Sequence, residues 1–574
     1  MNKETNTPGA GNKIIECVPN FSEGNNPEIL NRIAHEIKSV DQVKLINIDP
    51  GKATNRTVFT FVGTPEAVCE AAFRAVKTAA ELIDMSKHHG EHPRFGATDV
   101  LPLIPVRGVT MSETVEYARK LGKRIASELG IPIYFYEFAA TEEKRRNLAN
   151  CRAGEYEGLQ QKLADPAWKP DCGPAEFNET VKKTGAIALS ARNFLIAYNV
   201  NLNTTSTRWA NAIASDIREK GHLKRDGHSS TGKIVRDEHG NPVYTPGLLK
   251  GVKGIGWYIE EYGIAQLSFN ITDIEAVSMH QLFELACERA AVRGIRVTGS
   301  ELVGVVPLKV LLDAGKYFLR KQHRSTGIPD MEILKIAVKS MGLDELAPFD
   351  PKKKIIEYLV EEPQKKTVDL SLEKFTYETA SESAAPGGAS IAACIGALGA
   401  ALGTMAANLS ANRTGWEERW EEFSGQAEKG KLYYEELLRL VDEGTATLHS
   451  ITNAFRLPQK NEDERKHRHE VIQKATHLAV AVPFRVMQAS YNSMDLMLEM
   501  AENGNPHSVS DAGIGALAAR SAVLGAALNI RNIASGLDDK DYVSVLFDQV
   551  NALEKAAIEK ENRILEIVNR KIIQ

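Results

Sequence analysis

The sequence contains few cysteines, and none of them belongs to a metal-binding or redox pair. Only six occur in 574 residues, at positions 17, 69, 151, 172, 287 and 394, and no CxxC pair is present. This scatter argues against a zinc ribbon or a disulfide framework, and it predicts a reducing, cytoplasmic environment. The polar first residues, MNKETNTPGAGNK, lack the apolar segment of a secretory signal, so we interpret residues 1–12 as a disordered leader.

A strong excess of one charge is also lacking. The chain carries 70 Lys and Arg against 75 Asp and Glu, which gives a net charge of -5. No overall basic field therefore favours nucleic acid as a partner. Hydrophobic residues make up 43% and charged residues 25%, as in ordinary soluble protein. The length predicts several domains rather than one core.

Long hydrophobic runs are almost absent. The one candidate, residues 384–409, reads AAPGGASIAACIGALGAALGTMAANL and carries no charge. A membrane-spanning helix normally contains Leu, Ile and Phe, whereas Ala and Gly dominate here and allow helices to approach closely. We therefore expect a buried helix within a bundle and no membrane span.

What the chain does contain falls into two textures. In the first 360 residues, short β-branched runs such as IIECVPN and RTVFTFVG alternate with amphipathic stretches at Asn26–Ser39, Pro65–Asp84 and Ser112–Leu129. This alternation predicts two α/β subdomains with an α+β layered architecture, at 13–193 and 194–360.

Beyond a charged linker at 361–370, the β signals disappear. Long helical stretches follow, and they predict an all-α helical bundle at 371–574 with antiparallel helices. The expected helices are Gly388–Ala411, Trp416–Phe455, Glu462–Asn503, Ser508–Ser535 and Asp539–Ile572.

Three histidines stand close together in MSKHHGEHPRFGATDVLP, although the chain has only 14. His88 and His92 are four residues apart, as in a zinc-binding helix, and Asp99 is available as a third ligand. Gly90 and Pro93 break helices, however, so the segment is expected to form a loop. That expectation lowers the case for a metal site.

A catalytic site is the alternative interpretation of the same segment. It needs only one histidine that titrates near neutral pH, together with a carboxylate that orients the ring. Asp49, in the turn NIDPGKATNR, is the candidate carboxylate. Arg56 and Arg94 are candidate cations for an anionic substrate.

The segment PNFSEG follows a strand and precedes a helix. Ser22 or Asn20 could cap that helix, and its free amides could receive an anion. Taken alone, capping is the favoured interpretation.

Two further segments could carry chemistry in the helical half. In APGGAS, Gly387 and Gly388 precede a small-residue helix and would let backbone amides approach a ligand, although the lysine of a phosphate-binding P-loop is lacking. In SVSDAG, Ser510 and Asp511 stand at a helix start, where capping is the simpler interpretation. Asp511 is also available to a pocket.

These stretches, in this order, resemble the bifunctional formimidoyltransferase–cyclodeaminase family of histidine breakdown. The resemblance runs from about Ile14 to about Ile572 and includes the join between the halves. It rests on ECVPNFSEG, TNRTVFTFVG, LIDMSKHHGEHPRFGATDVLPLIPVRGV, RAGEYEGL, FLIAYNVNL, GIGWYIEE, LVGVVPL, IIEYLV and SAAPGGAS.

The resemblance implies two reactions on one folate. The front half would move a formimino group from N-formimino-L-glutamate to N5 of tetrahydrofolate and release glutamate. The back half would close N10 onto that carbon, expel ammonia and leave 5,10-methenyltetrahydrofolate. Folate would act as a polyglutamylated co-substrate, no metal is implied, and a homo-oligomer built from dimers, up to an octamer, is expected.

The resemblance also implies roles for particular residues of the front half. The family's transferase histidine falls on His92, which would act in general acid–base catalysis, and Asp49 matches an aspartate near it. The folate-binding segment of the family falls on 173–185, where Gly173, Pro174 and Gly185 match. Assigning Arg56 and Arg94 as carboxylate clamps is an inference from charge.

The helical half departs from the family at one important position. The usual catalytic aspartate falls on Gly444 in LVDEGTATLHSITNAFRLPQK. Asp442 is retained two positions earlier, but on a helix it faces about 200° away. Asp442 could be the acid in this chain, Asp511 could replace it, or the activity could be lost. We expect activity to be retained, with Gly387, Gly388, Ser390 and Asp511 in the folate site.

Two alternatives to the bifunctional interpretation follow from the sequence. One is a transferase alone, whose helical half holds folate or mediates oligomerisation. The other is a metal-dependent hydrolase that uses the histidine segment.

Overall fold

The computed structural model describes residues 13–51, 55–89, 94–227, 232–360, 366–383 and 385–573. They divide into two compact units. The first unit contains the described residues up to Leu311, together with those from Met341 to the end of the sheet-containing part. The second combines Leu312–Ser340 with the helices that follow residue 365.

The first unit contains a mixed seven-stranded sheet. Its strand order is β1-β4-β2-β5-β7-β6, with β3 beside β4, and β5, β7 and β6 run parallel to one another. The strands are β1 (Ile14–Cys17), β2 (Asn20–Phe21), β3 (Val43–Gly51), β4 (Arg56–Gly63), β5 (Thr98–Arg107), β6 (Ile133–Glu137) and β7 (Ile187–Ala191).

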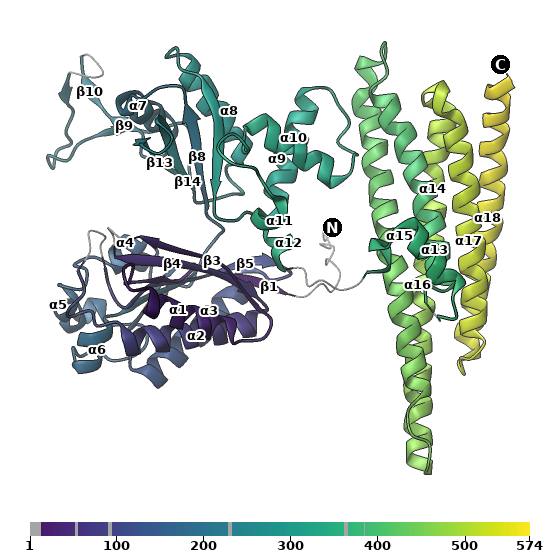
Figure 1. Ribbon diagram of the computed structural model, residues 1–574, viewed down its shortest axis with the longest axis horizontal. Helices are drawn as coiled ribbons and strands as arrows, with labels where there is room; N and C mark the ends of the chain where they lie inside the picture. The colour runs from purple at the N-terminus through teal and green to yellow at the C-terminus, as the bar shows by residue number, and fades with distance from the viewer. Residues whose placement is uncertain are drawn as a thin grey trace. The chain divides into compact units, whose positions relative to one another are not determined.

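Three helices cover one face of this sheet: α1 (Pro27–Lys38), α2 (Pro65–Leu82) and α3 (Met111–Leu129) (Figure 1). Their apolar sides join the inward residues of the strands in one core. Local signals set the ends of α3, because Thr110 and Glu113 form a capping box at its start and Gly130 ends it with φ +67°.

The second face of the sheet is covered only in part. The short helices α4 (Leu148–Cys151), α5 (Leu159–Ala164) and α6 (Glu179–Thr184) contribute to a smaller core with Phe95 and Tyr134. Two 3₁₀ turns, η1 (Glu143–Arg145) and η2 (Pro166–Trp168), lie in the same stretch of chain.

A second sheet in this unit has four antiparallel strands in the order β13-β14-β8-β15. Helices α7 (Thr207–Ile217) and α8 (Met279–Ala291) accompany it, and four short strands between α7 and β13 pair two by two. The strands are β8 (Ile196–Leu202), β9 (His222–Leu223), β10 (Arg225–Asp226), β11 (Lys233–Ile234), β12 (Tyr244–Thr245), β13 (Val252–Ile259), β14 (Ile264–Ile271) and β15 (Val297–Val303).

The chain then forms α9 (Leu308–Lys321), α10 (Asp330–Met341), α11 (Pro351–Lys354) and α12 (Ile356–Val360). The turn between α9 and α10 packs within the helical unit. There the Thr326 amide donates to Ser424 Oγ at 3.1 Å, and Lys431 Nζ donates to the Ile328 carbonyl at 3.0 Å. A polar, buried contact therefore joins this segment to helices a hundred residues later.

The helical unit is built on long helices and one short turn. They are η3 (Thr367–Asp369), α13 (Leu372–Ala380), α14 (Gly388–Ala411), η4 (Glu417–Arg419), α15 (Trp420–Phe455), α16 (Glu462–Asn503), η5 (Pro506–Ser508), α17 (Val509–Ala534) and α18 (Lys540–Ile573). Helices α15 and α16 extend past the others at one end (Figure 1).

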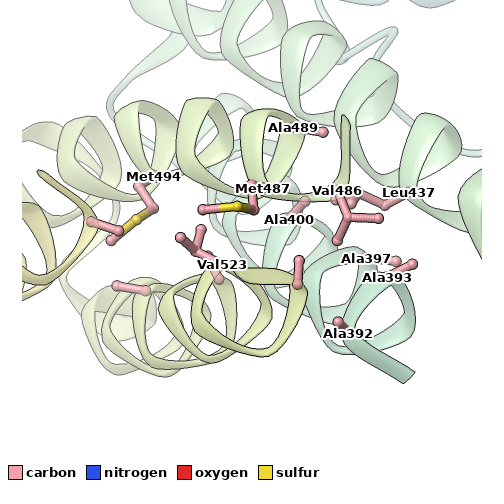
Figure 2. Close-up of a cluster of buried hydrophobic side chains, with 14 of the residues drawn as sticks. Ala392, Ala393, Ala397, Ala400, Leu437, Val486, Met487, Ala489, Met494 and Val523 are labelled. Atoms are coloured by element: carbon pink, nitrogen blue, oxygen red, sulfur yellow. The ribbon is translucent and has the colours of Figure 1, made fainter. Parts of the chain in front are cut away.

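Small residues set how closely these helices pack. An ideal Cβ on Gly399 would stand 2.8 Å from the Gly515 carbonyl, so α14 and α17 touch backbone to backbone. Figure 2 shows Ala392, Ala393, Ala397 and Ala400 of α14 in the same core, near larger side chains from α15, α16 and α17. Two helical segments, Gly388–Ala411 and Pro506–Ala534, are long and apolar enough to cross a membrane, and 56% and 50% of their apolar windows are buried.

The predicted division into a sheet-containing front and a helical back is confirmed. Helices Gly388–Ala411 and Glu462–Asn503 begin and end at the predicted residues. The sequence did not reveal α13, whose nine residues include none that are buried.

Replacing Gly399 by valine tests the close packing of α14 and α17. The new side chain meets the Gly515 carbonyl and the Ala518 methyl, so Gly399→Val should destabilise the helical unit by about 1–3 kcal/mol. The midpoint of urea unfolding, followed by far-ultraviolet circular dichroism, measures the change. Gly425→Val is the matched control, because the same substitution in α15 meets open space and should shift the midpoint little.

Candidate functional site

Two of the residues expected to serve the transfer, Asp49 and Arg56, lie at one edge of the first sheet. Strands β5, β6 and β7 are parallel, so all three begin at this edge, where β4 also begins and β3 ends. Asp49 stands in β3 with an exposed side chain, and Arg56 is the first residue of β4. His92 lies outside the described residues.

A β-bulge places a carboxylate at this edge. Asn20 pairs with Val100 and Phe21 pairs with Thr98, so β5 has one extra residue, Asp99, opposite β2. A bulge of this kind redirects the side chain of the extra residue. The Asp99 side chain is only 1% exposed, and Oδ1 accepts from the Phe95 amide at 3.1 Å.

Two guanidinium groups neutralise Asp99. Arg56 donates to Asp99 Oδ2 through Nη1, and Arg152 Nη2 lies 3.0 Å from the same oxygen. Arg56 Nε also donates to Asn20 Oδ1 at 3.0 Å. Burial lowers the pKa of Arg56, and Asp99 opposes that effect. The sequence did not identify Asp99 and Arg152 as a joint anchor for Arg56.

His88 is a buried, neutral histidine of this edge. Its Nε2 lies 2.9 Å from the Asn55 carbonyl, which implies the tautomer with a proton on Nε2. Burial lowers the pKa of His88. Among the described residues, its Nδ1 has no hydrogen-bond partner.

Asn55 connects three loops, and the sequence gave its side chain no role. Its Nδ2 donates to the His89 carbonyl at 2.8 Å, and its Oδ1 accepts from the Gly24 amide at 2.9 Å. The backbone of Asn55 has φ +47°, a conformation that asparagine tolerates better than most residues. The sequence signal that could have indicated this role is an asparagine in a tight turn between two strands.

Ser22 does not cap the helix that follows it, so that prediction was wrong, as it was for Asn20. Asn26 caps α1 and accepts from the Glu28 amide at 3.0 Å. Ser22 Oγ instead donates to the Gly96 carbonyl at 2.8 Å. Ser22 therefore joins the PNFSEG segment to the chain just after the histidine loop.

Arg94 is held by an acid that is itself exposed. It donates to Glu157 through Nη2 and to the Met85 carbonyl at 3.3 Å, and its guanidinium lies 5.5 Å from the Tyr156 ring centroid. The Arg94 side chain is 13% exposed and that of Glu157 is 60% exposed. An exposed partner is held weakly and exchanges readily for another anion.

The glycines of the predicted folate segment are required by close backbone contacts. Gly185 ends α6 with φ +67°, and a Cβ there would stand 2.4 Å from the Phe95 carbonyl. Gly173 has φ +92°, and a Cβ there would stand 2.6 Å from the Ile131 carbonyl. Gly173 and Gly185 thus support the same strand edge, and with Pro174 they remain predicted folate contacts.

No group of three His, Cys, Asp or Glu side chains in the described part of the chain could hold a metal ion. Asp99, the proposed third ligand, is instead engaged by arginine. His92 is not among the residues surveyed.

In the helical unit, the predicted glycine loop and Gly444 come together. Gly387 caps α14, and a Cβ on Gly388 would stand 3.1 Å from the side-chain amide of Asn529. Ser390 Oγ donates to the Val441 carbonyl at 2.8 Å. A Cβ on Gly444 would stand 3.0 Å from Ser390 Oγ, so a side chain at 444 would point to the start of α14.

The two candidate acids do not lie together with that loop. Asp442 Oδ1 accepts from the amides of Thr367 and Val368 at 2.7 and 3.4 Å, which directs it toward η3. Asp511 is 18 positions before Asn529 on α17, so within one chain it stands about 27 Å from Gly388.

A second polar cluster of the helical unit was not anticipated. Arg485 donates to Glu443 Oε2 at 2.6 Å through Nη1 and to Glu436 through Nη2. Arg485 also lines a cavity of about 270 Å³ with Phe484, Tyr542 and neighbouring apolar residues of α16 and α18. The sequence signal was weak, because these acids look like a solvated helix surface.

Comparison with known proteins covers nearly the whole chain. Family models match at residues 14–192 (formiminotransferase domain, N-terminal subdomain), 197–361 (formiminotransferase domain) and 371–552 (formiminotransferase-cyclodeaminase). The formimidoyltransferase-cyclodeaminase of Mus musculus is 41% identical over 530 residues, which are 92% of this chain and 94% of the relative. That of Dictyostelium discoideum is 37% identical and covers 98% of this chain and 100% of its own length.

The comparisons also include two shorter proteins. The glutamate formimidoyltransferase of Streptococcus pyogenes serotype M1 is 40% identical over 308 residues, which are 54% of this chain and 94% of the relative. The crystal structure of formiminotetrahydrofolate cyclodeaminase from Thermotoga maritima aligns with a TM-score of 0.32 at 20% identity, over 36% of this chain and 98% of that one.

Removing the charge of Asp99 tests the anchor of this edge. Asp99→Asn removes the buried carboxylate that Arg56 and Arg152 share, and breaking such a pair costs about 3 kcal/mol. We expect a lower urea midpoint and faster amide hydrogen exchange in β5. Asp41→Asn, an equal change at an exposed position, should alter neither measurement.

Proposed function

The chain belongs to the formimidoyltransferase–cyclodeaminase family, and we propose that its two halves act in turn on one tetrahydrofolate. The observation that carries the proposal is the match of both halves at once to full-length relatives of that name. A transferase whose helical half only holds folate is less well supported, because the third family model covers that half as well.

The sheet-containing half transfers the formimino group from N-formimino-L-glutamate to N5 of tetrahydrofolate. N5 must lose a proton as it gains the formimino carbon, and the departing glutamate nitrogen must gain one. An imidazole with a pKa near ~6.5 can do both, and His92 is the proposed carrier. Asp49, exposed at the end of β3, is proposed to orient the imidazole or hold N5.

Described residues before and after His92 are anchored to other parts of the sheet, which supports this role. Before it, the His89 carbonyl accepts from Asn55, and His88 contacts the Asn55 carbonyl. After it, the amide of Ala97 donates to the Thr184 carbonyl at 2.7 Å. Anchors on both sides reduce the number of positions that a catalytic side chain can take.

The two arginines are proposed to serve the substrate differently. Arg94 can exchange the exposed Glu157 for a carboxylate of formiminoglutamate or folate. The guanidinium of Arg56 is already paired with the buried Asp99. Arg56 would therefore bind a substrate carboxylate while its own side chain has less freedom to move. Gly173, Pro174 and Gly185 are proposed to support the folate, at backbone positions where a side chain would not fit.

The helical half closes N10 onto the transferred carbon and expels ammonia. The start of α14, with Gly387, Gly388 and Ser390, is the proposed folate contact, because backbone amides there can approach a ligand closely. Asp442 is the proposed acid. Its Oδ1 is held by two amides, and no described residue bonds to Oδ2.

We further propose that the protein is a cytoplasmic homo-oligomer built from dimers, up to an octamer, that uses polyglutamylated folate without a metal. Exposed apolar side chains along α14 and α17 support an assembly, since water-exposed stripes of this kind favour association. They are Leu398, Met405, Leu409, Ile514, Leu517 and Leu528. Sedimentation velocity would measure the assembly, and a monomer at micromolar concentration would contradict it.

The experiment that tests the bifunctional proposal supplies the purified protein with formiminoglutamate and tetrahydrofolate. Methenyltetrahydrofolate absorbance and free ammonia should rise together. Accumulation of 5-formiminotetrahydrofolate without ammonia would leave only the transferase, and absence of both products would refute the proposal.

Replacing His92 separates the two reactions. His92→Ala should reduce formimino transfer by roughly 10²–10⁴-fold, because the proton carrier is lost. Cyclisation of supplied 5-formiminotetrahydrofolate should stay close to the wild-type rate. His239→Ala, at an exposed turn, is the control and should leave both rates unchanged. Equal loss of both reactions in His92→Ala would contradict separate sites.

Replacing Asp442 tests the helical half. Asp442→Asn should slow ammonia release by at least roughly 10²-fold and leave transfer unchanged, since an amide cannot exchange the proton. The release rate with 5-formiminotetrahydrofolate as substrate measures this. Asp511→Asn is the comparison, because an unaffected Asp442→Asn rate with a slow Asp511→Asn rate would reassign the acid.

A further inference from the structure

The first sheet contains a buried carboxyl group, that of Glu16, which the proposed mechanism does not use. Glu16 stands in β1, the strand that pairs with both β4 and β5, opposite Val62 and Ile104. Its neighbours Ile15 and Cys17 belong to the core under the helices. Because side chains alternate along a strand, Glu16 faces the second side of the sheet.

Glu16 lacks the partners that such a group normally has. It is 3% exposed, and among the described residues only the charge of Arg192 acts on its carboxyl, with no hydrogen bond to it. The other two buried carboxylates of the described chain, Asp99 and Glu561, each bond to arginine. A buried acid without a hydrogen-bond partner is costly, so its presence indicates a partner that comes from outside the chain.

The surroundings of Glu16 bring the pKa of its carboxyl close to neutral pH. Burial raises its pKa to about 7, and Arg192, which follows β7, acts against this rise. Strands β4 and β5 present only Val62 and Ile104 to it. The adjacent Cys17 thiol is neutral, because burial raises its pKa. The acid can therefore become charged at neutral pH when a donor arrives.

Glu16 lies in line with the proposed reaction edge. Asn20, which holds Arg56, pairs with Val100, and Glu16 pairs with Ile104, so the two positions are about 13 Å apart along β5. Tyr136 and Ser190 stand opposite each other between these levels. Two further polar side chains thus share this side of the sheet with Glu16, at a level between it and the edge.

Tetrahydrofolate carries a group that suits this acid. The pterin ring presents N3–H beside its 2-amino group, two neighbouring donors that match the two oxygens of a carboxylate. N5 lies in the second ring, beyond the C4 carbonyl. Formiminoglutamate carries two carboxylates, which a charged Glu16 would repel.

We propose that the carboxylate of Glu16 binds the N3–H and 2-amino groups of the pterin ring and directs N5 toward the reaction edge. The inference rests on the proposed function of the sheet-containing half. In this role Glu16 binds substrate and takes no proton from the reacting carbon, because it stands too far along the strand.

An altered folate tests the contact without changing the protein. Tetrahydrofolate that lacks the 2-amino group loses one donor, and its dissociation constant for the wild-type protein should be roughly 10- to 100-fold higher than that of tetrahydrofolate. Anaerobic calorimetry measures both constants. Equal affinity for the two folates would overturn the proposal.

The matching variant is Glu16→Gln. It should raise KM for tetrahydrofolate by a similar factor and leave KM for formiminoglutamate unchanged, and it should bind both folates nearly equally. Glu128→Gln, an exposed acid of α3, is the charge-matched control and should keep the wild-type constants. A variant that loses kcat alone would show a proton-transfer role and contradict pterin binding.

The pH profile supplies an independent measurement. Only the ionised carboxyl accepts both donors, so the dissociation constant of tetrahydrofolate should rise up to tenfold per pH unit below about 7. In Glu16→Gln this dependence should disappear. If the wild-type protein transfers no formimino group, the proposed function fails. If it transfers the group but shows no discrimination and no such profile, the Glu16 assignment alone fails.

Discussion

The buried carboxylate of Asp99 is the interaction on which the edge of the first sheet depends. One extra residue in β5 places this charge where water cannot solvate it, so it must be met by cations and donors. Arg56 comes from the first residue of β4, and Arg152 caps the end of α4. The Phe95 amide comes from the chain that follows the histidine loop. One charge thus fixes the relative positions of three segments.

The two units pack their cores in different ways, and this determines where a ligand can reach polar groups. In the first, helices cover one side of the sheet and leave polar groups such as Asn20 and Glu16 on the other. In the second, alanine and glycine bring helix backbones into contact, as at Gly399 and Gly515. Such contacts leave little room between α14 and α17, so ligand contacts there fall to helix ends.

The sequence predicted what local signals encode and missed what distant contacts decide. Asn461 caps the start of helix Glu462–Asn503, and Gly504 follows its last residue. Both bounds could therefore be predicted from the sequence. Ser22 looked like a cap as well, but the carbonyl that it bonds belongs to Gly96, seventy-four residues later. Likewise, the α9–α10 turn is buried through its contact with Ser424. Asp442 is directed to η3 because its carboxylate accepts hydrogen bonds from backbone amides there.

Gly444 lets α15 approach the start of α14 closely, because a Cβ at this position would stand 3.0 Å from Ser390 Oγ. Its missing side chain would reach Ser390 Oγ, which bonds instead to the Val441 carbonyl one turn earlier on α15. An acid at 444 would stand beside the amides that begin α14, where negative charge is stabilised. The carboxylates that precede position 444 in the sequence, Asp442 and Glu443, bond instead to η3 and Arg485. Asp442, the proposed acid, would therefore approach the folate from the side of η3 and not from position 444.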